Sequence, residues 1–137
     1  MAIFGLDREP QVACRQALDA ARRMALALDD LNEAMSGDLD QPLRIGIGLH
    51  SGPTIVGQMG HERATQLTAI GDTVNTASRL ETLTKEFGVE LVVSQELLDR
   101  AGIDLAAYER HEVEIRGRQE RLAVRAVKRA TELTAMS

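Results

Sequence analysis

The sequence has few of the residue types on which several kinds of binding site depend. It contains one cysteine, no tryptophan and three aromatic residues, Phe4, Phe87 and Tyr108. A single Cys14 excludes an internal disulfide and a zinc cluster built on cysteines, so we expect it to be a small core residue. Three rings supply neither a platform for stacked bases nor an aromatic cage for a ligand.

Basic charge and long apolar runs are also scarce. Sixteen Lys and Arg stand against 21 Asp and Glu, a net charge of −5, whereas a general nucleic-acid-binding protein needs a basic surface. No apolar run approaches the roughly 20 residues of a membrane-spanning helix. The first residues lack the basic start of a secretory signal. We therefore expect no nucleic-acid partner, no membrane segment in this chain and a cytoplasmic location.

The residues that are present have the composition of a folded domain. Of the 137 residues, 44% are hydrophobic and 27% are charged, and one domain usually takes roughly 100–200 residues. No repeat, low-complexity tract or linker divides the sequence. The sequence therefore predicts a single domain over residues 1–137.

The first part of the chain predicts a strand, a long helix and a second strand. Residues 1–6 are mostly apolar and favour a strand. Apolar residues then recur in steps of three and four over residues 14–35, which indicates an amphipathic helix with Pro10 in its first turn and Asp7 as its cap. Residues 43–50 alternate Ile and Leu with Arg and Gly, as a strand does, and their glycine face permits close approach.

The second part predicts further strands and helices in alternation. We expect strands at 66–70, 89–93, 109–115 and 122–127, helices at 72–87 and 95–100, and an extended segment or short turn at 54–59. Ser94 is expected to cap the shorter helix. This order predicts an α+β fold, a ferredoxin-like sandwich with its helices on one face of a mainly antiparallel sheet.

Two glycine-rich segments can be compared with phosphate-binding loops, and neither matches the pattern of such a loop. Gly46, Gly48 and Gly52 lack the spacing of a dinucleotide-binding fingerprint and fall inside an expected strand. Residues 52–58 space their glycines as a Walker A loop does, but Gln58 stands where the lysine is needed. Neither segment is predicted to bind phosphate in that way.

A polar pair on one helix is the strongest chemical signal in the sequence. Asn75 and Arg79 are four residues apart, so they lie on one helical face, away from the apolar side of the helix. The Arg guanidinium is a fixed fork of donors that suits a phosphate, and the Asn amide both donates and accepts. The pair therefore suits a ribose and a phosphoryl group. A solvated helix face is the alternative that spacing alone leaves open.

Several motifs, in order and at the right separations, resemble the class III nucleotide cyclase catalytic domain. They are RIGIGLHSGP at residues 44–53, a Gly57-x-x-Gly60 pair, and IGDTVNTASRLE at residues 70–81. The IRGR turn at residues 115–118 also fits the family. The resemblance covers most of the chain.

The resemblance implies a reaction and a set of site residues. Family members form composite sites between two head-to-tail domains, where Mg²⁺ or Mn²⁺ ions held by two aspartates activate the ribose 3′-hydroxyl for attack on the α-phosphate. By resemblance, Asn75 orients the ribose and Arg79 stabilises charge on the α-phosphate. Thr68 matches a purine-reading position and favours ATP over GTP. Arg116 stands where the family usually has a lysine that contacts the triphosphate.

The family pattern places both metal-binding aspartates and a purine-reading lysine before the position of Met1. We therefore expect no metal ligand and no bound Mg²⁺ or Mn²⁺ in this chain, and little or no catalysis by it alone. The intact domain is expected to be a homodimeric adenylate cyclase that forms cyclic AMP and pyrophosphate from ATP. The alternatives are a degenerate cyclase-like module that dimerises or binds nucleotide without catalysis, and a protein-interaction domain with no nucleotide role.

Three further features allow a structural explanation as well as a functional one. His50, His61 and His111 fall in different elements without the convergent spacing of a zinc site, so we expect structural or surface roles for them. The loop at 58–66 resembles the family's dimerisation arm, with a solvated charged run as the alternative. An unpaired strand at residues 1–6 would favour self-association through its open edge.

Overall fold

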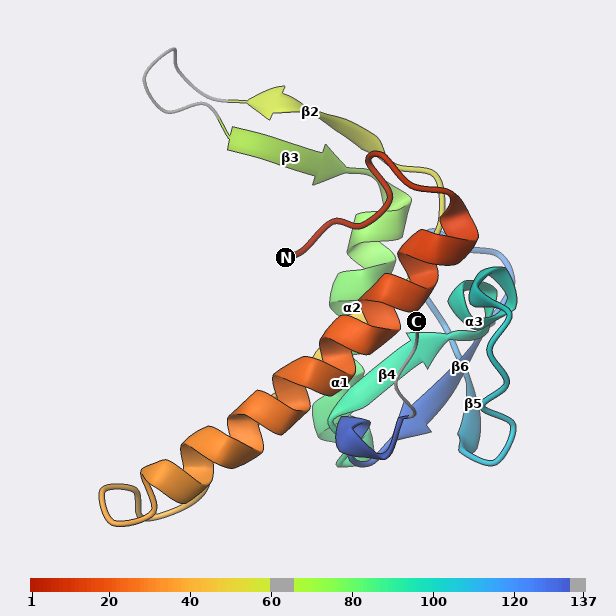
Figure 1. The fold of residues 1–137 in the computed structure, drawn as a ribbon. Coiled ribbons are helices and arrows are strands. Elements are labelled where there is room, and N and C mark those ends of the chain that lie inside the picture. Colours follow the sequence, from red (N-terminus) through yellow and green to blue (C-terminus); the bar gives the residue numbers. More distant parts are fainter. Residues whose placement is uncertain (60–65, 134–137) are drawn as a thin grey trace.

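The computed structural model describes residues 1–59 and 66–133, in which helices and strands alternate (Figure 1). The helices are α1 (Pro10–Ala34), α2 (Asp72–Phe87) and α3 (Gln95–Ala101), followed by a short 3-10 turn, η1 (Ala130–Glu132). The strands are β1 (Ile47–Leu49), β2 (Ile55–Met59), β3 (Gln66–Ile70), β4 (Leu91–Ser94), β5 (Glu109–Val113) and β6 (Leu122–Val127). None of these described helices is long and apolar enough to cross a membrane. The centre of the expected arm, with His61, lies outside the described residues.

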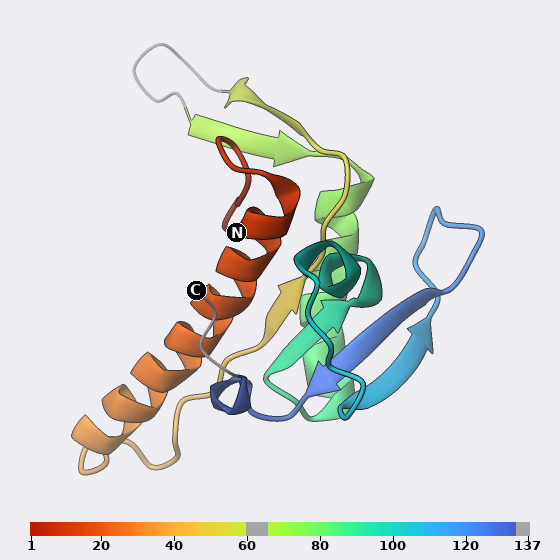
Figure 2. The ribbon, with the colours of Figure 1, turned by 45° about the vertical axis from the view of Figure 1, so that its right-hand side comes forward.

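Within the described part of the chain, β1, β4, β6 and β5 form one sheet in that order. Strand β1 runs parallel to β4, with Ile47 opposite Leu91, whereas the β4–β6 and β6–β5 pairs are antiparallel. Strands β2 and β3 form a separate antiparallel hairpin in which Ile55 lies opposite Ile70. The hairpin projects from the end of the molecule where α2 begins (Figure 1 and Figure 2). The sheet is thus mainly antiparallel, as predicted.

The helices cover both faces of the sheet. Successive side chains of a strand point to opposite faces. Leu91 and Val93 of β4 belong to one core cluster with Cys14 of α1 and residues of α3, whereas Val92 belongs to a second cluster with Leu80 of α2. The α+β sandwich and the core position of Cys14 are confirmed. The expectation of helices on one face is wrong, because β4 is apolar on both faces and each face needs a cover.

Helix α2 lies directly against β1 because glycine leaves room for it. A methyl group added at Gly48 would collide with the backbone of Ala77 and Glu81, and one added at Gly46 would collide with the Thr84 hydroxyl. Hydrogen in place of a side chain allows this close approach between strand and helix. The glycine face predicted for residues 43–50 therefore fixes where α2 lies.

The N-terminal segment differs from its prediction. Residues 1–6 pair with no described strand and are not a strand themselves, because apolar composition alone does not supply the neighbour that a strand's backbone groups need. Pro10 occupies the first turn of α1 as expected. No side chain caps that helix, so the prediction of Asp7 as its cap is wrong.

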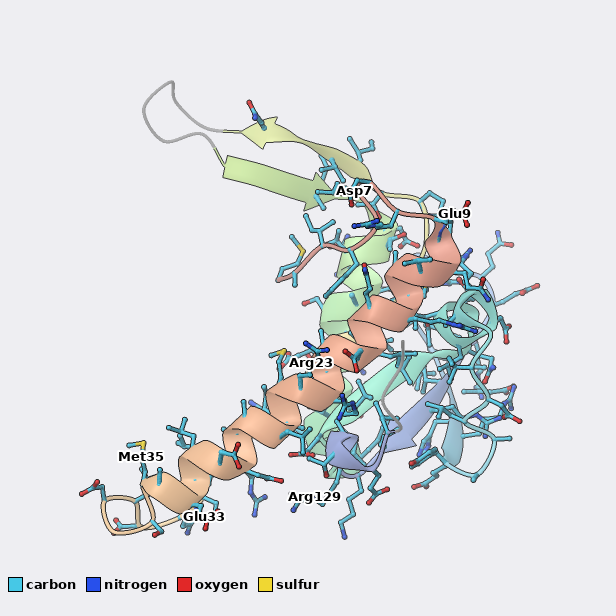
Figure 3. All side chains as sticks on the ribbon, viewed as in Figure 1. Asp7, Glu9, Arg23, Glu33, Met35 and Arg129 are labelled. Atoms are coloured by element: carbon cyan, nitrogen blue, oxygen red, sulfur yellow. The ribbon has the colours of Figure 1, made fainter. Side chains whose placement is uncertain are left out.

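The C-terminal end of α1 extends beyond the sheet, with Met35 at its tip (Figure 3). Arg129, which follows β6, donates to both carboxylate oxygens of Asp29 at 2.9 and 2.8 Å. The Asn32 side chain exchanges two hydrogen bonds with the backbone of Leu43, at 3.0 and 2.8 Å. The first contact holds the extended end of α1 to the segment after β6, and the second holds it to the chain that returns to β1.

Candidate active site

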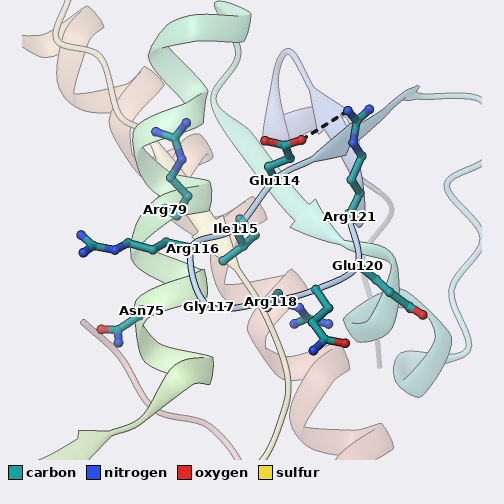
Figure 4. Close-up of a pocket in the computed structure, with 10 residues that line it drawn as sticks. Asn75, Arg79, Glu114, Ile115, Arg116, Gly117, Arg118, Glu120 and Arg121 are labelled. Atoms are coloured by element: carbon teal, nitrogen blue, oxygen red, sulfur yellow. Dashed lines mark hydrogen bonds and ion pairs between the residues drawn. The ribbon is translucent and has the colours of Figure 1, made fainter.

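A cavity of about 760 Å³ lies between α2 and the loop that joins β5 to β6 (Figure 4). Asn75 and Arg79 reach it from α2, one helical turn apart, and both are exposed. The loop supplies the rest of the described lining, residues 114–121. The structure therefore brings Asn75 and Arg79 together with Arg116, three of the four residues that the sequence singled out.

The described lining is cationic although the chain as a whole is acidic. It contains four arginines, at positions 79, 116, 118 and 121, against two glutamates, Glu114 and Glu120, while the whole chain has a net charge of −5. Arg guanidinium groups bind phosphate or carboxylate oxygens through two parallel hydrogen bonds. The arrangement therefore favours an anionic ligand with several oxygens.

The arginines of the loop differ in how they are held. Arg118 donates to Glu96 of α3 at 2.7 Å, and Arg121 donates to Glu114 at 3.3 Å. Arg116 is exposed and forms no ion pair with a residue that the structure describes. Its guanidinium is therefore the one in this loop that is most available to a ligand.

A tight turn places Arg116 at the tip of the loop. The Arg118 N–H donates to the Ile115 carbonyl at 3.0 Å, and Gly117 has a φ of +90°. A β-turn with a positive φ at its third residue is a type II geometry, which favours glycine there. The Ile115 side chain is buried in the core cluster below α2. A buried residue and a glycine thus flank the exposed arginine.

The start of α2 is fixed by the segment that precedes the β2–β3 hairpin. Gly71 forms the corner between β3 and α2. The Thr73 hydroxyl donates to the Pro53 carbonyl at 2.6 Å, which ties the first turn of α2 to the chain leaving β1. This contact helps to orient the helix face that carries Asn75 and Arg79. Arg79 also lies 3.7 Å from the exposed carboxylate of Glu86.

Thr68 is the predicted site residue that the described cavity lining does not include. It lies on β3, where its backbone is opposite Gly57 of β2. Its side chain is outside the described residues. A role for Thr68 in purine recognition therefore stays a prediction.

The described residues do not fit a site for divalent metal ions. Mg²⁺ binds mainly through oxygen ligands, carboxylates above all. In the cavity, Glu114 is paired with Arg121, and Glu120 is the only other described carboxylate of the lining. No group of three His, Cys, Asp or Glu that suits a metal gathers elsewhere in the described part of the chain. We therefore derive no step through a metal ion.

Sequence reasoning did not find a polar network that borders the cavity. The side chain of His50 is 2% exposed, and its Nδ1 lies 2.8 Å from the Ser94 hydroxyl. Its Nε2 lies 4.0 Å from Glu96. Ser94 also caps α3 as predicted, by accepting a hydrogen bond from the Leu97 N–H at 3.2 Å. The parallel pairing of β1 and β4 brings His50 and Ser94 together, because both strands end at the same edge of the sheet.

Burial lowers the pKa of His50 below its ordinary value of 6.5. Glu96 and Asp72 oppose this shift, while the positive charges of Arg118 and Arg100 add to it. A lowered pKa keeps the imidazole neutral near pH 7. His50 is therefore a buried neutral group that borders the ion pair of the cavity loop.

Residues 1–126 match the family described as the adenylate and guanylate cyclase catalytic domain. The chain belongs to this family. An adenylate cyclase of Anabaena cylindrica is 37% identical over 101 residues, which are 71% of this chain and 20% of that protein. The human retinal guanylyl cyclase 1 is 40% identical over 79 residues, 58% of this chain and 7% of that protein. This cyclase chain thus spans a fifth or less of these curated relatives.

The cyclase fold is also found among solved structures. The crystal structure of the guanylyl cyclase Cya2 aligns with a TM-score of 0.76 at 27% identity, covering 90% of this chain and 62% of that one. The arrangement of α1, α2 and the mixed sheet is therefore that of a cyclase catalytic domain. The names of these similar proteins include adenylate and guanylyl cyclases. Family membership alone therefore does not decide whether the substrate carries adenine or guanine.

Proposed function

We propose that this chain is the ATP-binding part of an adenylate cyclase catalytic domain, folded as one domain over residues 1–137, with its nucleotide site between α2 and the β5–β6 loop. One observation carries the proposal. Asn75, Arg79 and Arg116 converge on a cationic cavity in a chain of net negative charge. Family membership supports cyclase chemistry, and the convergence of these three residues supports the location of the nucleotide site.

In the proposed reaction, the ribose 3′-oxygen of ATP attacks the α-phosphorus. The bond from that phosphorus to its β-bridging oxygen breaks, and cyclic AMP, pyrophosphate and the proton of the 3′-hydroxyl are released. Asn75 holds the ribose, and Arg79 donates to the α-phosphate oxygens as they gain charge. Arg116 holds the departing pyrophosphate. Because phosphoryl transfer depends mostly on positioning and charge stabilisation, an oriented donor such as Arg79 contributes about 2.7–4 kcal/mol.

We infer ATP rather than GTP as the substrate from Thr68. A hydroxyl can accept a hydrogen bond from the adenine amino group, and the Anabaena cylindrica relative is named an adenylate cyclase. T68A should narrow the preference for ATP over GTP in competitive binding, whereas T82A, an exposed change on α2, should not. Unchanged selectivity in T68A would remove Thr68 from the site.

We further propose that the intact domain works as a homodimer with composite sites and uses Mg²⁺ or Mn²⁺, and that this 137-residue stretch alone forms little or no cyclic AMP. The family pattern assigns the metal-binding aspartates to a segment before the position of Met1. Asn75 and Arg79 are exposed in the single chain, which suits a site that a second copy completes.

The test compares this chain with a chimaera that carries, before Met1, the segment that precedes the matched region in the Anabaena cylindrica relative. The chain should bind ATP in calorimetry without turnover, and the chimaera should form cyclic AMP. In the chimaera, R79A should lower kcat about a hundredfold to a thousandfold with little change in KM. R129A, which breaks the distant ion pair with Asp29, is the matched control.

Each other outcome has a distinct meaning. Turnover by the 137-residue chain would overturn the proposed inactivity. ATP binding without turnover in the chimaera would favour a cyclase-like module that binds nucleotide without catalysis. Absence of ATP binding in both proteins would overturn the nucleotide site itself.

A further inference from the structure

Among the described residues of the cavity loop, Arg118 is the one that forms an ion pair with a different part of the fold. Its guanidinium donates to Glu96, in the first turn of α3, at 2.7 Å, and the two side chains are 25% and 40% exposed. Arg121 of the same loop pairs with Glu114, which lies on the other arm of the β5–β6 hairpin. That second pair therefore cannot fix the loop relative to the rest of the molecule.

Glu96 stands on a rigid support. The next two residues of α3, Leu97 and Leu98, are 2% and 0% exposed in the core. Ser94, two residues before Glu96, caps the helix, and its hydroxyl also lies 2.8 Å from the buried His50 ring. The backbone that carries Glu96 is thus held firmly, whereas the loop tip that its carboxylate contacts contains a glycine.

We propose that Glu96 is a positioning residue that holds Arg118, and through it the turn at residues 115–118, so that Arg116 reaches the phosphates of a bound nucleotide. The inference rests on the proposed function and deepens it. Figure 4 shows Arg116 extending from this turn toward α2, between Arg79 and Asn75. Without an anchor at Arg118, the turn can pivot at Gly117, because glycine tolerates many backbone conformations.

If Glu96 acted only through its charge, its removal would strengthen anion binding, whereas a positioning role predicts weaker binding. This difference makes the inference testable. Removing a carboxylate beside a cationic cavity raises the local positive potential and should tighten the binding of an anion. If Glu96 positions the loop, E96Q should instead weaken that binding, because the neutral amide keeps the shape of the side chain but holds Arg118 less strongly.

The first measurement is calorimetric binding of inorganic pyrophosphate to the 137-residue chain at low ionic strength. E96Q should weaken the affinity about two- to fivefold, as expected for one partly exposed ion pair. E120Q is the matched control: Glu120 lines the cavity but forms no ion pair with a described residue, so its removal should tighten binding. In the R118Q background, E96Q should weaken binding no further. Unchanged or tighter binding by E96Q would overturn the inference.

The second measurement needs no ligand. Hydrogen exchange of the amides at residues 114–121 should be faster in E96Q than in the wild-type chain, and unchanged in E120Q. Equal exchange in E96Q would overturn the positioning role even if affinity fell. If the wild-type chain binds no pyrophosphate, the proposed function fails, while exchange still decides whether Glu96 holds the loop. If E96Q does not fold, R118Q removes the same contact from the loop side, and hydrogen exchange of residues 114–121 is again the measurement.

Discussion

The buried imidazole of His50 links protonation to folding. Its pKa is lowered in the folded chain by burial, from an ordinary value of 6.5. The unfolded chain therefore takes up this proton at a higher pH than the folded chain does. The stabilising effect of a neutral His50 is complete above pH 6.5 and is lost as the pH falls from there toward the lowered folded value.

We expect the free energy of unfolding, measured with urea at a series of pH values, to fall as the pH drops below 6.5. One proton sets an upper limit of about 1.36 kcal/mol per pH unit on this slope. H50Q should remove that part of the slope. H111Q, which changes a histidine stacked on Phe87 with ring centres 4.0 Å apart, is the control and should retain it. An unchanged slope in H50Q would contradict the assignment.

Gly48 offers a second prediction at the scale of one residue. An added methyl group would meet the α2 backbone at Ala77 and Glu81, and backbone cannot rotate away as a side chain can. G48A should therefore destabilise the chain by about 1–3 kcal/mol, the usual cost of overpacking a core. G57A is the matched control, because nothing lies within 4 Å of its added methyl group. Equal unfolding midpoints for the two variants would contradict the packing of α2 on β1.

At the scale of elements, local pattern predicted several helices and strands well. Helix α2 and strands β3 and β6 have the bounds that the sequence predicts, 72–87, 66–70 and 122–127. Strand β1 is shorter than predicted, because only residues 47–49 pair with β4. The length of a ladder depends on the neighbouring strand, which lies far away in sequence, so alternation alone overestimates it.

The candidate site was predictable where its motif is local. Asn75 and Arg79 share one helix, so their spacing alone places them on one face. Arg116 was found by resemblance, because nothing in its neighbourhood shows that the β5–β6 loop faces α2. The contact of Arg118 with Glu96 joins residues 22 apart in sequence through the packing of α3 against the sheet, and no periodic pattern marks such a pair.

The turn between β5 and β6 should affect both the stability of the chain and its affinity for a ligand. Gly117 has a φ of +90° and nothing within 4 Å of an added methyl group, so G117A strains the backbone without a clash. We expect a loss of about 1 kcal/mol in unfolding free energy and weaker pyrophosphate binding. G37A, a glycine in open space without positive φ, is the control for both measurements. Equal pyrophosphate affinity in G117A and the wild type would show that the turn does not set the position of Arg116.

At the scale of the whole molecule, the net negative charge of the chain and the cationic cavity have opposite effects on an anionic ligand. A chain of net charge −5 repels a polyphosphate at a distance, whereas the arginines at 79, 116, 118 and 121 attract it inside the cavity. Salt screens exposed charges over a Debye length of about 10 Å at 0.1 M. The sign of the salt effect therefore reports which of the two fields governs binding.

We expect added NaCl to weaken pyrophosphate binding, because a ligand in the cavity would be closer to the lining arginines than to most acidic groups of the chain. The slope of log affinity against log salt should be shallower in R116Q than in the wild type, since one fewer cation contacts the ligand. R129Q, which removes a cation held by Asp29 away from the cavity, should leave the slope unchanged. Binding that tightens with salt would mean that the net charge of the chain, and not the cavity, determines the encounter with an anion.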